Sequence, residues 1–205
     1  MMTGERFSQP SYQVRRKVFK LFGGSFDVYG PDGSLVLFAS QKAFKLKEDI
    51  RLYSDKDRSQ ELLVIKARNI IDFSAAYDVE DPISGRKLGA FKRKGWRSLL
   101  RDQWIIMDAA DKEVGYIRED SALMAAVRRF VPFAVFIPQS YHCEVQGVAA
   151  CVYRQNFNPF VSKINIDFPQ DASGFDKRMG IAGAVLLSAI EGKQSGGGGG
   201  FDLGI

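Results

Sequence analysis

The chain has one histidine, two cysteines and no long apolar run, and each of these scarcities excludes a class of protein. A single imidazole, at His142, removes most metal-centre and catalytic-triad chemistries, which depend on that side chain. Two cysteines without a metal-ligand spacing exclude a disulfide framework and indicate a reducing compartment. No stretch reaches the ~18 apolar residues of a membrane-spanning helix, and the N-terminal segment lacks the apolar core of a secretory signal. We therefore expect a cytoplasmic protein.

The composition is that of a folded protein with a mild excess of positive charge. Of 205 residues, 45% are hydrophobic and 26% are charged, which excludes extensive disorder and suffices for one domain or two small ones. The 29 lysines and arginines exceed the 24 acidic residues and give a net charge of +5. An excess of this size favours an anionic partner only where the charges are clustered.

Short apolar or alternating segments, separated by turn signals, fill the first three-quarters of the chain. The clearest is a hairpin in which residues 26–29 and 35–38 flank the turn Gly30-Pro-Asp-Gly33. Similar segments follow at 62–65, 73–79, 87–91, 104–107, 114–117, 141–145, 149–153 and 161–168. About twelve strands of ~4–8 residues at even spacing predict an antiparallel sandwich or barrel.

Two segments have the periodicity of a helix. In residues 121–130 apolar side chains recur at i, i+1, i+4 and i+7, which is typical of one face of a short helix, and Pro132 would end it. In residues 174–191 apolar side chains cover every side of the helix, so the whole surface must be buried. Ser173 resembles the first residue of a capping box, and Gly192 resembles the residue that follows a helix C-terminus.

Twelve short strands and one helix that is apolar on all sides have a simple arrangement, in which the sheet closes into a barrel and the helix fills it. We therefore predict a mostly β protein with a closed antiparallel barrel, a C-terminal helix inside it and one short helix. The expected organisation is a disordered arm over residues 1–11, a barrel domain over 12–192 and a flexible Gly-rich tail over 193–205.

Several stretches, in order, also resemble a known superfamily. They are DGSLVLF at 32–38, YDVED at 77–81 with the segment to residue 89, WIIMD at 104–108 with GYI at 115–117, and DKRMGIAGAVLL at 176–187. Together they are similar to the tubby C-terminal-like superfamily, on its branch of LURP-one-related proteins and phospholipid scramblases, over roughly residues 12–192. The resemblance implies a twelve-stranded barrel threaded by a C-terminal helix, and it implies binding of phosphoinositide headgroups through basic residues of the barrel.

The densest positive charge lies in residues 86–101, RKLGAFKRKGWRSLLR, which hold seven basic side chains and no acidic one. Clustered cations beside a tryptophan suit a phosphate group at a lipid interface. The candidate residues for binding a headgroup, chosen by this clustering, are Lys92, Arg93, Lys94, Trp96, Arg97 and Arg101. The alternative is a hairpin loop that these charges merely keep soluble.

Two further basic segments are weaker candidates. Residues 125–137 combine two arginines with aromatic and aliphatic residues, a mixture that suits a membrane interface; the alternative, which we favour, is a helix and loop that close one end of the barrel. The candidate residues for the membrane interface are Arg128, Arg129, Phe130 and Phe133. Near the N-terminus, Arg15 and Lys17 would lie on one face of a strand and Arg16 on the other, as expected of an edge strand protected by charge.

His142 and Cys143 do not form a nucleophilic pair, because adjacent residues of a strand point to opposite faces. Across the turn at 146–147, Cys143 is expected to pair with Ala150 rather than Cys151, so no disulfide is predicted.

Acidic residues that could bind calcium lie in the predicted turns, at Asp78, Glu80, Asp81, Asp108 and Asp111, and before the late helix, at Asp167, Asp171 and Asp176. The turn residues do not have the order of an EF-hand loop. The acids before the late helix are explained by the helix dipole. We therefore expect no metal, no cofactor and no catalytic residue.

The function that we expect is a non-catalytic module at the membrane surface that binds anionic phospholipid headgroups. The alternatives are a protein-interaction scaffold without a lipid ligand and a nucleic-acid-binding protein. Nucleic acid is the weaker of the two, because the six candidate residues of the basic cluster include a single base-stacking side chain, Trp96, where single-strand binders usually use several.

Overall fold

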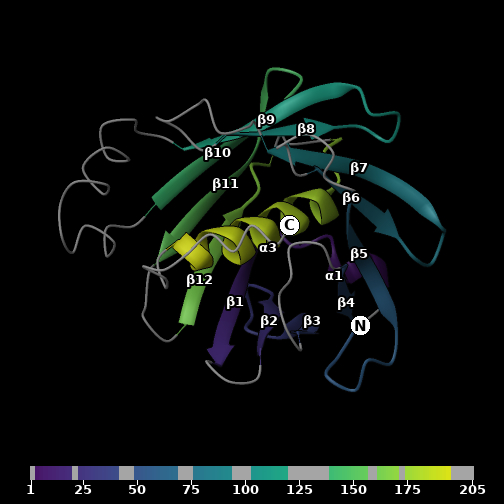
Figure 1. Cartoon of the computed structure of the whole chain (residues 1–205), viewed down its shortest axis with the longest axis vertical. Helices are drawn as coiled ribbons and strands as arrows, with labels where there is room; N and C mark the ends of the chain where they lie inside the picture. The colour runs from purple at the N-terminus through teal and green to yellow at the C-terminus, as the bar shows by residue number, and fades with distance from the viewer. Residues whose placement is uncertain are drawn as a thin grey trace, which may run out of the picture.

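The structure, a computed structural model, describes residues 3–19, 23–41, 49–68, 76–93, 103–119, 139–156, 161–170 and 174–194. Their elements follow one another in the order α1, β1 to β12 and α3 (Figure 1). The strands are β1 (Ser11–Phe19), β2 (Gly23–Tyr29), β3 (Leu35–Gln41), β4 (Ile50–Tyr53), β5 (Glu61–Ala67), β6 (Ala76–Asp81), β7 (Arg86–Arg93), β8 (Gln103–Met107), β9 (Glu113–Glu119), β10 (Gln139–Val145), β11 (Val148–Asn156) and β12 (Val161–Asp167). The helices are α1 (Thr3–Arg6) and α3 (Lys177–Gln194).

The twelve strands form one closed antiparallel barrel, which confirms the predicted fold class. Each strand pairs with its neighbours in the sequence, and the barrel closes where β1 pairs with β12, from Ser11 opposite Asp167 to Lys17 opposite Val161. Closure gives β1 a partner on each side, β12 and β2. The expectation that β1 is an edge strand protected by its charges is therefore wrong, because a closed barrel has no edge.

Helix α3 runs through the middle of the barrel with strands around it (Figure 1). Every residue from Met179 to Ala189 is buried, as the apolar surface of this segment predicts. Glycine is needed where β11 approaches the helix, because a Cβ on Gly183 would lie 2.7 Å from the hydroxyl oxygen of Tyr153. That hydroxyl donates a hydrogen bond to the Gly180 carbonyl at 3.1 Å, so β11 and α3 are hydrogen-bonded where the glycines allow them to approach closely.

Both ends of α3 differ from the prediction. The Asp176 carboxylate caps the helix by accepting a hydrogen bond from the Arg178 backbone N–H at 2.9 Å. A carboxylate at this position satisfies a free N–H group and complements the positive end of the helix dipole. Ser173, the predicted cap, lies outside the described residues. At the other end the helix continues through Gly192 to Gln194, although glycine inside a helix costs about 1 kcal/mol relative to alanine.

The barrel has two unlike ends. At the end where α3 begins, tight turns join β2 to β3, β4 to β5, β6 to β7, β8 to β9 and β10 to β11, and we call it the turn end. The opposite end, beside the C-terminal half of α3, we call the mouth end. The connections between strands at the mouth end run through residues outside the described part of the chain.

Residues 3–11, part of the arm predicted to be disordered over residues 1–11, are among the described residues and contact the barrel. Helix α1 covers the turn end, where Arg6 Nη1 donates to the carbonyls of Val36 at 2.8 Å and Ser54 at 2.9 Å. Lys177 at the start of α3 donates to the Gln9 carbonyl at 2.8 Å. Hydrogen bonds to other segments, rather than helix propensity, hold these residues in place. The short helix predicted at 121–130 and residues 195–205 of the predicted tail lie outside the described residues.

The two cysteines face each other, which corrects the predicted register. Cys143 on β10 stands opposite Cys151 on β11, because the pairing shifts by one residue between Cys143 and Glu144. A bulge of this kind places two residues of one strand against one of its partner, and counting back from the turn does not detect it. Both cysteines are buried free thiols. His142 is exposed while Cys143 is buried, so the two point to opposite faces as predicted.

Candidate functional site

The predicted headgroup cluster has two members, Lys92 and Arg93, among the described residues. They end β7 and point to opposite sides of the sheet, because consecutive residues of a strand alternate. Arg93 stands opposite the buried Trp104 and faces the interior at the mouth end, whereas Lys92 faces outward. The structure therefore does not bring these two side chains together on one face. The other candidates lie outside the described residues: Lys94, Trp96, Arg97, Arg101, Arg128, Arg129, Phe130 and Phe133.

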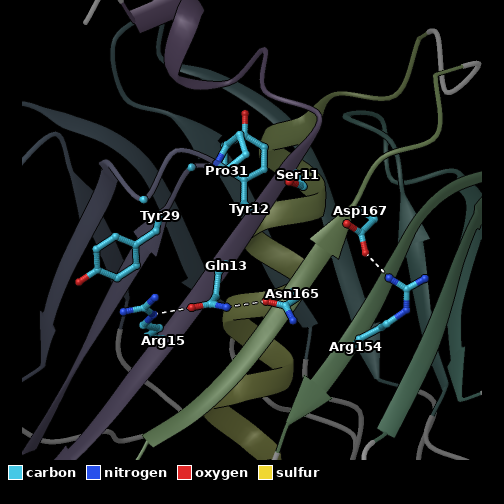
Figure 2. A pocket seen from close by; sticks show the side chains of 11 residues that line it. Ser11, Tyr12, Gln13, Arg15, Tyr29, Pro31, Arg154, Asn165 and Asp167 are labelled. Atoms are coloured by element: carbon cyan, nitrogen blue, oxygen red, sulfur yellow. Dashed lines mark hydrogen bonds and ion pairs between the residues drawn. The ribbon is translucent and has the colours of Figure 1, made fainter.

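A polar groove lies on the outer surface of the barrel, at the place where β1 pairs with β12 (Figure 2). Its volume is about 400 Å³, and it extends from the β2–β3 turn across β1 and β12 to β11. The residues that line it are Ser11, Tyr12, Gln13, Arg15, Tyr29, Gly30, Pro31, Gly33, Arg154, Asn165 and Asp167. Residues with an odd number on β1 and β12 supply most of these side chains, because they are the ones that point away from the apolar core.

Neutral polar groups orient Arg15 at the centre of this groove. Gln13 and Asn165 stand opposite each other, and Gln13 Nε2 donates to Asn165 Oδ1 at 2.7 Å (Figure 2). Arg15 Nε donates to the side-chain oxygen of Gln13, and its guanidinium lies 4.4 Å from the centre of the Tyr29 ring. These partners fix the direction of the guanidinium without removing its charge.

Beneath Tyr29 lies a carboxylate that a ligand in the groove does not reach directly. Asp27 is 1% exposed and accepts a hydrogen bond from the Tyr29 hydroxyl at 3.2 Å. Burial, and then the charge of Asp27, raise the pKa of Tyr29 above its ordinary value. Tyr29 therefore stays protonated at neutral pH and presents an uncharged aromatic face to Arg15.

Cations of three neighbouring strands lie in or next to the groove: Arg15 and Arg154 line it, and Lys163 is next to it on β12. Arg15 on β1 stands directly opposite Lys163 on β12, and Arg154 on β11 stands opposite Asn165, the next outward residue of β12. Arg154 pairs with Asp167 in a surface ion pair (Figure 2). Lys163 makes no ion pair with any residue that the structure describes. On its other side Arg15 stands directly opposite the buried Asp27 of β2. Like charges directly opposite in a sheet are destabilising, so an anion bound between Arg15 and Lys163 would offset the repulsion between these two cations.

Most of the acidic residues considered for calcium make ion pairs instead, Asp108 accepts backbone hydrogen bonds within its own turn, and Asp171 lies outside the described residues. Asp78 accepts from Arg68 at 2.6 Å and from Lys87 at 3.0 Å, and Asp81 accepts from Arg178 at 2.9 Å. In the described ranges no three potential metal ligands form a group. The charge available for a ligand is therefore mainly positive, and it lies on β1, β11 and β12.

The groove can hold an anionic group that also carries hydroxyls. Guanidinium and ammonium groups bind phosphate oxygens, while the amides of Gln13 and Asn165 and the hydroxyls of Ser11 and Tyr29 suit a sugar or polyol. The sequence points to Arg15 through its basic run. Lys163 and Arg154 carry no such signal, because each is a single cation in its own strand and only barrel closure brings them beside Arg15.

Neither helix in the described part of the chain is long and apolar enough to cross a membrane. No family model matches the sequence, and searches of curated proteins and of solved structures find no match. The resemblance to the tubby C-terminal-like superfamily therefore stays a prediction, while the barrel with its central helix is observed directly.

Proposed function

We propose that this protein is a non-catalytic module that binds anionic phospholipid headgroups at a membrane surface, and that the outer groove holds the headgroup phosphate. The observation that carries the proposal is the placement of Arg15 directly opposite Lys163. A phosphate between them would relieve their repulsion and accept charge-assisted hydrogen bonds from both.

The surroundings of this pair support the same ligand class. The groove is open along the outer wall of the barrel, so a headgroup can enter while its acyl chains stay in the bilayer. Its volume of about 400 Å³ is within the range of small-ligand sites. The basic residues at 92–101 and the arginine and aromatic residues at 128–133 are proposed as additional membrane contacts, and cytoplasmic localisation is part of the proposal.

Simple electrostatics sets the strength of attachment. A Lys or Arg near an anionic leaflet contributes about 1 kcal/mol, so Arg15 and Lys163 together contribute about 2 kcal/mol, a factor of roughly 30 in partitioning. That strength suits weak, reversible recruitment and not permanent anchoring. It also falls steeply with salt, because exposed charges are screened over about 10 Å at 0.1 M ionic strength.

Co-sedimentation with vesicles tests the proposal. Vesicles of phosphatidylcholine alone, with phosphatidylserine, or with phosphoinositide are each mixed with the protein at low and high salt. The wild type should pellet with the anionic vesicles, most strongly with phosphoinositide and at low salt. The double variant Arg15→Gln/Lys163→Gln should lose about 30-fold in partitioning.

The matched control removes the same charge elsewhere. Arg51→Gln/Lys112→Gln changes two cations on β4 and in the β8–β9 turn, away from the groove, and should keep most of the binding. A variant with Lys92, Arg93, Lys94 and Arg97 changed to alanine measures the cluster predicted from the sequence. Equal losses in the two double variants, or equal wild-type binding to neutral and anionic vesicles, would reject the groove and favour a protein-interaction scaffold.

A further inference from the structure

The inner surface of the barrel, apolar along most of its length, becomes polar at the mouth end. Five adjacent strands each contribute one inward polar side chain: Arg16 on β1, Ser162 on β12, Gln155 on β11, Gln139 on β10 and Glu119 on β9. Arg16 stands directly opposite Ser162, and Gln155 stands directly opposite Gln139. The C-terminal half of α3 faces this row, because Arg16 Nη1 donates to the carbonyl of Ser188 at 3.0 Å.

Arg16 is a buried cation without a counter-ion in the described structure. It is 7% exposed, and its guanidinium lies 5.9 Å from the centre of the Phe26 ring. No carboxylate in the described ranges pairs with it, and its buried Nε has no hydrogen-bond acceptor there. Burial lowers the pKa of Arg16, yet a guanidinium remains charged at neutral pH. An uncompensated charge inside a protein is strongly destabilising, so its retention calls for an explanation.

Other polar atoms without partners gather around the same guanidinium. They are Ser162 Oγ, Ser188 Oγ and Gln155 Oε1, all buried and none hydrogen-bonded within the described part of the chain. Ser162 faces Arg16 across the β1–β12 pair, and Gln155 stands opposite Ile164, one step along the inner face of β12 from Ser162. Buried polar atoms in native proteins nearly always have a partner, which is water or a ligand where no protein group is available.

We propose that the mouth end holds a small oxyanion of the phosphate class inside the barrel, bound by the Arg16 guanidinium and by the hydroxyls of Ser162 and Ser188. The free Nε–H of Arg16 and the two hydroxyls are donors, and a tetrahedral oxyanion presents several acceptor oxygens. Water would satisfy the hydroxyls but would leave the charge of Arg16 uncompensated. Gln155 contributes a donor as well when its amide is turned so that the nitrogen replaces Oε1.

This site is distinct from the outer groove. Arg15 and Arg16 are neighbours on β1, but Arg15 points outward to the groove and Arg16 points inward to α3. The two sites are therefore separable, because removing the outward cations Arg15 and Lys163 leaves the inward Arg16 in place. Failure of either site leaves the other testable.

Isothermal titration with orthophosphate and with sulfate, at constant ionic strength, tests the inner site. Both titrations use the Arg15→Gln/Lys163→Gln protein, so that the outer groove does not contribute to the binding. This protein should bind phosphate, and the further change Arg16→Gln should weaken that binding at least tenfold. Arg16→Met is the second variant, because an apolar side chain of similar length leaves no unsatisfied amide in the interior and should fold even if Arg16→Gln does not.

Thermal unfolding supplies the second readout. In the same Arg15→Gln/Lys163→Gln background, phosphate should raise the unfolding midpoint of the protein that keeps Arg16 but not that of the protein with Arg16→Met. Vesicles that contain phosphatidic acid separate the sources of the phosphate: Arg16-dependent pelleting assigns a lipid phosphate, and Arg16-dependent binding of orthophosphate alone assigns a soluble one. Arg15→Gln/Lys163→Gln protein that binds neither phosphate nor sulfate, or that binds them as tightly after the further change Arg16→Met, would overturn the proposal.

Discussion

Each end of the barrel has an arginine that contacts α3, but one arginine is paired with carboxylates and the other is not. At the turn end, Arg178 in the first turn of α3 pairs with Asp81 at 2.9 Å and with Asp176 at 2.6 Å. At the mouth end, Arg16 reaches the helix at Ser188 and has no carboxylate partner among the described residues. The turn end has the features of a structure optimised for stability. The mouth end departs from that pattern, and such departures tend to mark functional sites.

Other contacts extend this contrast. At the turn end aromatic rings stack beside the start of the helix, with Tyr12 edge-on to Phe168 at 5.9 Å between ring centres. Carboxylates of Asp32, Asp55, Asp81 and Asp108 accept backbone hydrogen bonds within their own turns. At the mouth end, by comparison, buried polar atoms of Arg16, Ser162 and Gln155 lack partners within the described structure. Among the described residues, charged and polar side chains are therefore more fully paired at the turn end than at the mouth end.

The largest effect should come from the feature that both ends share, the buried central helix. Val185→Asp places a carboxylate where the wild-type side chain is 0% exposed and should cost at least about 4 kcal/mol, enough to abolish folding. Val148→Asp makes the same substitution where the side chain is 56% exposed and should leave the protein folded. Circular dichroism and size-exclusion chromatography measure both. A folded, soluble Val185→Asp protein would contradict the central position of α3.

Replacing the two arginines by methionine tests the comparison directly. Arg178→Met leaves Asp81 and Asp176 without their partner and should lower the free energy of unfolding by about 1–2 kcal/mol, since the arginine side chain is only partly exposed. Arg16→Met removes a buried charge and should leave that free energy unchanged or raise it in phosphate-free buffer. Urea unfolding measures both variants. Equal destabilisation would show that Arg16 is a structural group like Arg178.

Acid should weaken the turn end first. The pKa of Asp81 is lowered: burial is the largest single influence and raises it, but hydrogen bonds from Ser84, Ile83 and Arg178 together outweigh burial. A carboxyl whose pKa is lower in the folded than in the unfolded chain stabilises fully above the unfolded value, about 3.9 for Asp, and this stabilisation is lost as the pH falls through the folded value. We expect less than about 1 kcal/mol for this group, because it is partly screened by solvent.

Urea unfolding between pH 7 and pH 3 checks this expectation. The Asp81→Asn variant should lose less stability across that range than the wild type. Asp57→Asn, in the exposed β4–β5 turn, makes the same change in charge and should follow the wild-type curve. If both variants have the same pH dependence, the ion pair of Asp81 with Arg178 does not account for acid sensitivity.

The smallest effect concerns the thiols between the two ends. A hydrogen bond with Cys151, and then burial, raise the pKa of Cys143 well above its ordinary value, so little thiolate is present at pH 8. Neither cysteine should react with a thiol reagent in the native protein, and both should react after unfolding in urea. Val148→Cys supplies an exposed control that should react at once. Rapid labelling of the native wild type would show that the wall formed by β10 and β11 opens.

The sequence predicts the barrel because few folds meet two requirements at once, closure of the sheet and burial of the helix. Many short strands need closure, and a helix that is apolar on every side, such as Met179 to Ala189, needs burial on every side. The alternation of Arg15 and Arg16 on β1 also follows from the sequence, since it depends only on strand geometry. These predictions rest on local patterns, and the local patterns are preserved in the structure.

Long-range pairing is what the sequence does not reveal. The groove depends on the meeting of β1 with β12, which sets Arg15 against Lys163, and no local signal connects these two residues. Cys143 stands opposite Cys151 because of a single bulge, and the position of that bulge is set by packing. The helix begins at Lys177, and Asp176 both caps it and pairs with Arg178, a partnership that the capping pattern in the sequence does not reveal.

The position of α3 has a consequence for how the chain acquires its structure. Synthesis delivers the helix after all twelve strands, yet the helix is the innermost element, and β1 cannot complete its pairing until β12 has emerged. The entropy of joining segments from opposite ends of the domain must be overcome before their contacts contribute, which makes folding slow. Until the helix arrives, the inner faces of the strands expose apolar side chains that favour aggregation. A nascent chain that stalls after β12 would therefore be a preferred client of chaperones, and a released fragment of that length would aggregate.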